Sequence, residues 1–114
     1  MKAQFLGHVV FYVENIKNSL EFYHDLIVFE IVGSFEKPFS AVALSAGRTH
    51  HELLLIEVGL APKPPKGHRI GLYHIGINIG DSLKELSTVK DELISSGIII
   101  NGMSDHTVSQ SIYI

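Results

Sequence analysis

The 114-residue sequence contains no cysteine and no tryptophan, and these absences narrow its possible chemistry. Without cysteine, disulfide bonds and thiolate metal sites are excluded, so any transition metal would need His, Asp or Glu ligands. No apolar stretch is long enough to span a bilayer, and Met1–Leu6 resembles no secretion leader. We therefore expect a cytoplasmic protein with no membrane partner.

The sequence also has little net charge, because its 9 Lys and Arg residues nearly balance its 12 Asp and Glu residues. The formal charge of −3 lacks the basic footprint of a nucleic-acid-binding protein, so we expect no nucleic-acid partner. The length suits one compact domain over residues 1–114. Seven histidines are many for this length, and their placement is the most informative feature.

The first part of the sequence, about residues 1–60, predicts a β-α-β-β-β module. Residues 5–13 form a β-branched and aromatic run typical of a strand, and 15–27 repeat apolar residues at helical spacing. Three further strands are expected, separated by turns, at 29–35, 39–46 and 50–58. Residues 59–69 contain three of the four prolines, Pro62, Pro64 and Pro65, which predicts a linker.

The pattern then restarts in a second module, about residues 70–114. Tyr73–Ile79 reads as a strand, Ser82 and Glu85 fit a helix capping box, and Gly97 ends the helix. Short strands are expected at 98–100 and from 110 to 114. We therefore predict an α+β fold of two βαβββ modules forming a cup-shaped mixed sheet flanked by helices, the second module lacking its last strand.

An offset of 66 residues relates the two modules and places His8 on His74. Strand alternation puts His74 on a polar face with little bulk, and His8 shares a face with Val10 and Tyr12. A lone strand histidine is more often a partly buried residue bonded to backbone. Two at equivalent points of a pseudo-twofold repeat instead favour one shared metal, since neutral imidazole binds first-row divalent ions well.

The predicted fourth strand adds further candidates. Alternation places His51 and Glu57 on one face, together with Leu53 and Leu55, and leaves His50 and Glu52 on the other, where we expect them to be solvated. A solvated strand-end carboxylate is an equally good interpretation of Glu57.

Several segments resemble the vicinal-oxygen-chelate superfamily, which contains the glyoxalases, bleomycin-resistance proteins and extradiol dioxygenases. Leu6–Val13 with Ser19–Tyr23 is similar to the superfamily's opening, whereas three other segments are more similar to catechol 2,3-dioxygenase-type extradiol enzymes. These are the paired His50-His51, Gly71–His74 and Asp105–Ser109 followed by Ile112–Ile114.

The resemblance implies a role for each matching residue. His8 and His74 match the two metal-binding histidines, His51 and His106 match histidines that contact substrate or oxygen, and Tyr113 matches a tyrosine that bonds the catecholate. The implied cofactor is Fe(II), with Ni, Zn or Mn as alternatives, and the implied substrates are a catechol-like compound and O₂, as in aromatic catabolism. The family's third ligand, a strand Glu, would fall beyond Ile114. The glycine usual after the first helix is replaced by Val28.

Two other functions remain open. In a glyoxalase I-like lyase or isomerase, Glu57 stands at the matching point for a ligand beside His8 and His74. A non-catalytic antibiotic-binding protein would need no metal ligands. An unpaired strand edge would also favour a homodimer.

Overall fold

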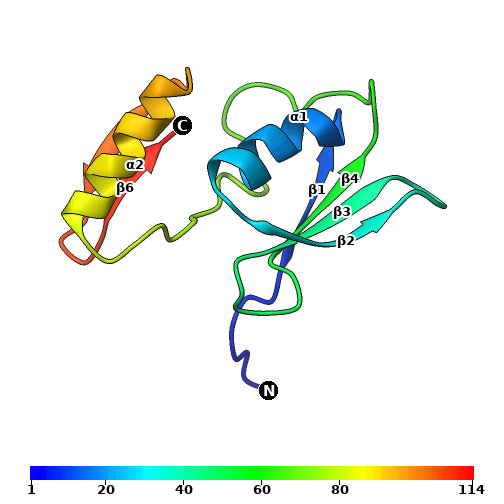
Figure 1. Cartoon of the computed structure of the whole chain (residues 1–114), viewed down its shortest axis with the longest axis horizontal. Coiled ribbons are helices and arrows are strands. Elements are labelled where there is room, and N and C mark those ends of the chain that lie inside the picture. The colour runs from blue at the N-terminus through cyan, green and yellow to red at the C-terminus, as the bar shows by residue number, and fades with distance from the viewer. The chain divides into compact units, whose positions relative to one another are not determined.

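The computed structural model describes all of residues 1–114 and divides them into two compact units. Unit 1 is Met1–Lys66 and unit 2 is Gly67–Ile114 (Figure 1). The boundary between them lies in segment 59–69, which forms neither helix nor strand, as its prolines predict. No helix combines the length and the apolar composition that crossing a membrane would require.

Unit 1 has the predicted β-α-β-β-β order, with a four-stranded mixed sheet arranged β1-β4-β3-β2. Its first helix changes from α-helical to π-helical hydrogen bonding, and the second part is called η1. The elements are β1 (Val9–Val13), α1 (Ile16–Leu20), η1 (Glu21–Leu26), β2 (Glu30–Phe35), β3 (Ala41–Ser45) and β4 (Leu53–Glu57).

The strand pairing fixes which side chains share a face of this sheet. β1 runs parallel to β4 with Val9 opposite Leu53, and β3 runs antiparallel to β4 with Leu44 opposite Leu53. β2 pairs antiparallel with β3, and its register shifts between Ile31 and Gly33. β4 therefore lies in the interior, between the edge strand β1 and β3 (Figure 1).

One face of the sheet packs against the helix and forms the core of unit 1. Phe11 on β1 stacks on Tyr23 of η1 with ring centroids 6.3 Å apart, and Leu44 and Leu55 are completely buried. Burial raises the pKa of the Tyr23 hydroxyl above its ordinary value. Each buried leucine contributes about 2 kcal/mol by its removal from water.

The first helix ends without the glycine that the resemblance described above implies at this point. Asn15 caps its start by accepting from the backbone N–H of Asn18. At its end, Val28 takes a left-handed φ of 67°, and the backbone N–H of Phe29 donates to the carbonyl of Tyr23 at 3.0 Å. The imidazole of His24 contacts the Phe29 carbonyl at 2.7 Å, which holds the chain in this reversal.

Two predicted strands of unit 1 begin later than the sequence pattern indicates. The first was expected from residue 5 and the fourth from residue 50, but β1 begins at Val9 and β4 at Leu53. The reason is shared, since these two strands pair with each other and residues 46–52 form a turn instead of extending the ladder. The apolar run at residues 5–7 thus has no strand beside it.

Unit 2 contains one helix and one hairpin. These are α2 (Leu83–Ser95), β5 (Gly102–Asp105) and β6 (Gln110–Tyr113). The predicted capping box is present, because the Ser82 hydroxyl accepts from the N–H of Glu85 and the Glu85 carboxylate accepts from the N–H of Asp81. Gly97, with φ of 78°, ends the helix as predicted.

The predicted strand Tyr73–Ile79 is not hydrogen-bonded into a sheet, and neither is the predicted strand at 98–100. In unit 1 the equivalent strand β1 pairs with β4, whereas in unit 2 β5 and β6 pair only with each other. Tyr73–Ile79 therefore lacks the partner that makes β1 a strand. Its alternation survives all the same, since Ile75, Ile77 and Ile79 are half-buried and the even positions are exposed.

Candidate functional site

Three histidine rings gather where β1 begins and β4 is about to begin. The backbone N–H of Val9 donates to the carbonyl of Glu52 at 2.9 Å, which holds the two segments side by side. The His8 ring centroid lies 4.6 Å from that of His51 and 6.3 Å from that of His50. His50 and His51 contact each other through their Nδ1 atoms at 2.6 Å, so one donates and the other accepts.

The turn that carries His50 and His51 is organised by Glu52. Its carboxylate accepts hydrogen bonds from the backbone N–H groups of Ala46, Arg48 and Thr49 at 2.9, 3.0 and 2.9 Å. Burial alone would raise the pKa of this carboxyl, but the hydrogen bonds outweigh it and hold the pKa below its ordinary value. Glu52 was predicted to be merely solvated, and this is wrong.

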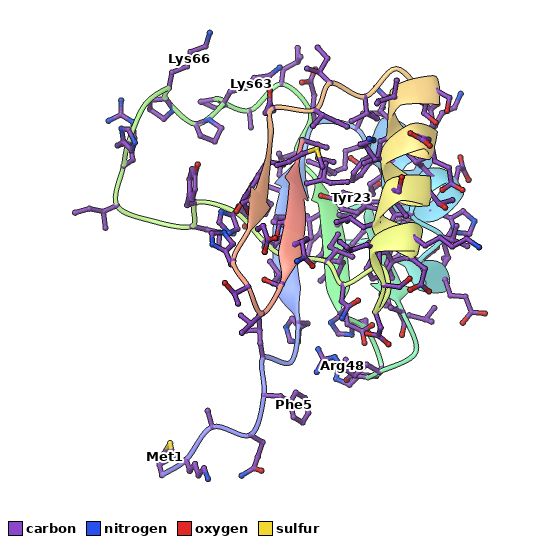
Figure 2. All side chains as sticks on the ribbon, turned by 90° about the vertical axis from the view of Figure 1, so that its left-hand side faces the viewer. Met1, Phe5, Tyr23, Arg48, Lys63 and Lys66 are labelled. Carbon is purple, nitrogen blue, oxygen red and sulfur yellow. The ribbon has the colours of Figure 1, made fainter.

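Arg48 ties the N-terminal segment to the same turn. Its guanidinium donates to the carbonyl of Leu6 at 2.9 Å and is 3.8 Å from Glu52. The guanidinium also lies 5.2 Å from the centre of the Phe5 ring, and Figure 2 labels both side chains. These contacts anchor residues 5–7 although they form no strand. They hold His8 beside His51.

The surroundings of His51 favour its neutral form. Partial burial lowers its pKa first, and the neighbouring His50 and His8 lower it further, against an opposing effect of Glu52. The His51 imidazole is therefore uncharged near pH 7 and able to accept a proton from a group placed next to it.

Glu57 lies on the other face of the sheet from His8. In the parallel register Glu57 is opposite Val13, whereas His8 precedes Val9 and shares the face of Val10. The Glu57 carboxylate accepts from the backbone N–H of Ile16 at 2.8 Å, so it caps the start of α1. The sequence predicted that His51 shares a face with Leu53, Leu55 and Glu57. That face packs against the helix as the core, whereas His51 precedes β4 and its ring lies beside His8.

Unit 2 brings His74 and Tyr113 together. Their ring centroids are 6.0 Å apart, and the ring centroid of Tyr73 lies 4.9 Å from that of His74. The Tyr113 hydroxyl is 3.2 Å from the hydroxyl of Ser104, which fixes the orientation of the phenol. His74 itself is exposed.

His106 lies in the turn that joins β5 to β6. Its backbone N–H donates to the carbonyl of Ser109 at 2.8 Å, and Asp105 accepts from the N–H of Thr107 at 2.9 Å. Tyr113 pairs with Gly102 at the opposite end of the hairpin. The structure therefore separates His106 from Tyr113 by the length of the hairpin, and the catalytic role of His106 stays a prediction.

Comparison with known proteins identifies the fold. Residues 5–113 match the family described as the Glyoxalase/Bleomycin resistance protein/Dioxygenase superfamily. The chain belongs to this superfamily. Its members include enzymes, bind small molecules and often bind metals, so the broad class predicted from the sequence is confirmed.

Several solved structures show the same fold at low sequence identity. A glyoxalase family protein from Enterococcus faecalis is 20% identical with a TM-score of 0.76, covering 96% of this chain and 86% of that protein. A lactoylglutathione lyase from Agrobacterium tumefaciens is 20% identical with a TM-score of 0.72, covering 99% and 86%. An integron cassette protein from the mobile metagenome of V. cholerae is 20% identical with a TM-score of 0.58, covering 98% and 84%. No curated protein matches the chain.

The histidines of the chain could supply part of a metal site of the kind found in the superfamily. Neither unit contains a group of three or more His, Asp or Glu side chains that could hold a metal ion by itself. His8 and His74 are exposed imidazoles with no other assigned role, and neutral imidazole suits Fe, Ni and Zn alike. They belong to different units, so their meeting at one ion stays a prediction.

Sequence reasoning missed Arg48 and misassigned Glu52, which together hold the histidine turn. The one available signal was their spacing of four residues, with Arg48 inside the Gly47–Thr49 turn. A carboxylate that follows a tight turn often accepts from the turn's free N–H groups, as a helix cap does.

Proposed function

We propose that this chain is a metal-dependent extradiol-type dioxygenase that cleaves a catechol-like ring. The observation that carries the proposal is the 4.6 Å separation between the rings of His8, the predicted metal ligand, and His51, the predicted proton acceptor. An isomerase of the glyoxalase type has no use for a histidine at position 51. An extradiol enzyme needs one beside its metal.

The roles of the chain's residues follow from this placement. His8 and His74 would hold the metal, and Fe(II), when bound, would supply the site at which the diol and O₂ meet. His51, adjacent to His8, would accept the proton that a catechol hydroxyl loses on binding. Proton transfer by a positioned side chain accelerates a reaction by about 10²–10⁴-fold.

Tyr113 would orient the bound ring. Its hydroxyl is held by Ser104, and its ring lies against His74, so a phenol O–H is available beside the second predicted ligand. Since a hydrogen bond to the charged form of a diol stabilises that form, Tyr113 would favour the deprotonated substrate.

A glyoxalase-type isomerase is the second candidate, and the solved lactoylglutathione lyase fold is the finding that favours it. Against it, the Glu57 carboxylate that this function needs as a ligand is bonded to the N–H of Ile16 on the core face of the sheet. Ni²⁺-dependent activity on a hemithioacetal that Glu57→Gln abolishes would establish this candidate instead.

The test of the proposed function is anaerobic reconstitution of the full chain with Fe(II), followed by air and a panel of catechols. We expect a yellow ring-opened product from at least one catechol. His51→Ala should slow turnover by about 10²–10⁴-fold while leaving the metal bound. Lack of product across the whole panel, with Fe(II) demonstrably bound, would contradict the proposal.

A further inference from the structure

The hydrogen bond between the rings of His50 and His51 can run in either of two directions. Their Nδ1 atoms are 2.6 Å apart, and a neutral imidazole carries its proton on one of its two nitrogens. Two facing Nδ1–H groups would repel each other, and two bare nitrogens would form no bond. The neutral pair therefore has two forms, which differ in whether His51 or His50 is the donor.

The two forms differ in what the second ring nitrogen of His51 can do. When His51 donates from Nδ1, its Nε2 has no proton and is able to accept one. When His50 donates instead, the proton of His51 is on Nε2, and neither nitrogen of that ring can act as a base. The hydrogen bond at one ring nitrogen thus decides the chemistry of the other.

The backbone on both sides of the histidine pair is held by hydrogen bonds. Before the pair, Thr49 donates its N–H to the Glu52 carboxylate at 2.9 Å, and its carbonyl accepts from the hydroxyl of the buried Ser45 at 3.0 Å. After the pair, Glu52 donates its N–H to the carbonyl of Leu44 at 2.9 Å, and its own carbonyl accepts from Val9 at 2.9 Å. Because both flanking residues are fixed, little backbone freedom is left to lose when the two rings meet.

The two rings differ in their access to water. His50 is exposed, whereas His51 is half-buried and lies closer to His8, with ring centroids 4.6 Å apart against 6.3 Å for His50. An exposed His50 can keep its proton on Nε2, where water accepts the hydrogen bond. A proton on Nε2 of His51 would need a partner in a half-buried position, and an unpaired buried donor is costly. The exposures therefore favour donation from His51 to His50.

We propose that His50 is a positioning residue, which holds the proton of His51 on Nδ1 and leaves Nε2 of His51 to accept a proton from the catechol. The inference rests on the proposed function for the role of His51. In the transfer, the O–H bond of the catechol breaks, its electron pair stays on oxygen, and an N–H bond forms at Nε2. His51 is then a cation whose Nδ1–H still donates to His50. A hydrogen bond from a charged donor is about twice as strong as a neutral one, so His50 stabilises the product of the transfer.

The first test determines the tautomer of His51 in the full chain without metal or substrate. At about pH 8, where an ordinary imidazole is neutral, the NMR shifts of its ring nitrogens should show the proton on Nδ1. His50→Asn keeps an acceptor at the same point along the side chain and should retain this form. His50→Phe keeps a ring but no acceptor, so the proton should move to Nε2. His68→Phe, at an exposed linker position, is the matched control and should leave the tautomer of His51 unchanged.

The second test measures turnover of a catechol by the full chain reconstituted with Fe(II). His50→Phe should lower kcat by at least about tenfold, within the 10²–10⁴-fold that a positioned base supplies, and should leave KM unchanged. His50→Asn should restore most of kcat, because it restores the acceptor. A purely structural role of His50 would instead lower stability or raise KM without moving the proton of His51.

Three results would each overturn the inference: a proton on Nε2 of His51 in the native chain, an unchanged tautomer in His50→Phe, or an unchanged kcat in that variant. Failure of the proposed function looks different. A chain whose His51 tautomer depends on His50 but which cleaves no catechol with Fe(II) refutes the oxygenase alone. A chain that cleaves catechols with His51 protonated on Nε2 refutes this inference alone.

Discussion

The two units begin alike in sequence but differ in how completely each buries its helix and strands. Unit 1 contains seven of the eight buried apolar residues, and unit 2 contains only Leu93. The difference traces to β4, which pairs with β1 and β3 at once and brings Leu53 and Leu55 under the helix. Unit 2 has no strand in that role, so Tyr73–Ile79 keeps its alternation without a ladder. The stability of the chain therefore rests mainly on unit 1.

The largest expected effect comes from Leu55→Ala in the core of unit 1. Leu55 is completely buried, so its truncation should reduce the free energy of unfolding by about 2–5 kcal/mol. Leu93→Ala in unit 2 should cost less, because Leu93 is the only buried apolar residue of its unit and its surroundings can relax. Urea unfolding followed by circular dichroism measures both, and equal losses would refute the unequal division of stability.

A smaller effect is expected at Glu57, which links β4 to the start of α1. Glu57→Ala leaves the N–H of Ile16 without its acceptor and should lower stability by about 1–2 kcal/mol. Glu57→Gln keeps an acceptor oxygen and serves as the matched control, with a smaller loss. Neither variant should change metal affinity, and a loss of metal in the Gln variant would favour the isomerase.

At Val28 the expected change is a gain. A β-branched residue with φ of 67° is strained, and left-handed backbone costs about 1–2 kcal/mol for a residue other than glycine. Val28 is also 75% exposed, so removing its side chain forfeits little burial. Val28→Gly should therefore stabilise unit 1 by about 1 kcal/mol, less the added freedom of the unfolded chain. A lower melting temperature would show that the Val28 side chain has a role in the fold.

The smallest predicted effect is a pH dependence due to Glu52. Its pKa is lower in the folded chain than the ordinary 4.5, so its contribution to stability is present above that pH and is lost as the pH falls further. Chemical denaturation between pH 7 and pH 3 should show a steeper loss for the native chain than for Glu52→Gln. Identical slopes would mean that the hydrogen bonds to the turn do not favour the charged carboxylate.

Local patterns in the sequence predicted most of the fold. The capping box at Ser82 and Glu85, the stop at Gly97 and the β-α-β-β-β succession of elements along unit 1 all depend on neighbouring residues or on simple alternation. Strand pairing could not be predicted in the same way, because whether Tyr73–Ile79 forms a ladder depends on a partner strand and not on its own residues.

The same distinction between local patterns and strand pairing applies to the candidate site. Alternation correctly gave His8 the face of Val10 and Tyr12. It also assigned Glu57 to the site, because the register between β1 and β4 cannot be predicted from the residues of either strand alone. The proximity of His51 to His8 depends on a turn held by Glu52 and Arg48 through backbone hydrogen bonds. Hydrogen bonds to backbone groups place few demands on residue type, so the sequence does not predict them.

We propose that His8 and His74 together bind one metal ion, with His51 beside it. Titration of the metal-free full chain with Fe(II) under anaerobic conditions, followed by calorimetry, tests this most directly. We predict one ion per chain, tight binding lost equally in His8→Ala and His74→Ala, and binding retained in His51→Ala. Unchanged binding in either of the first two variants would contradict the account.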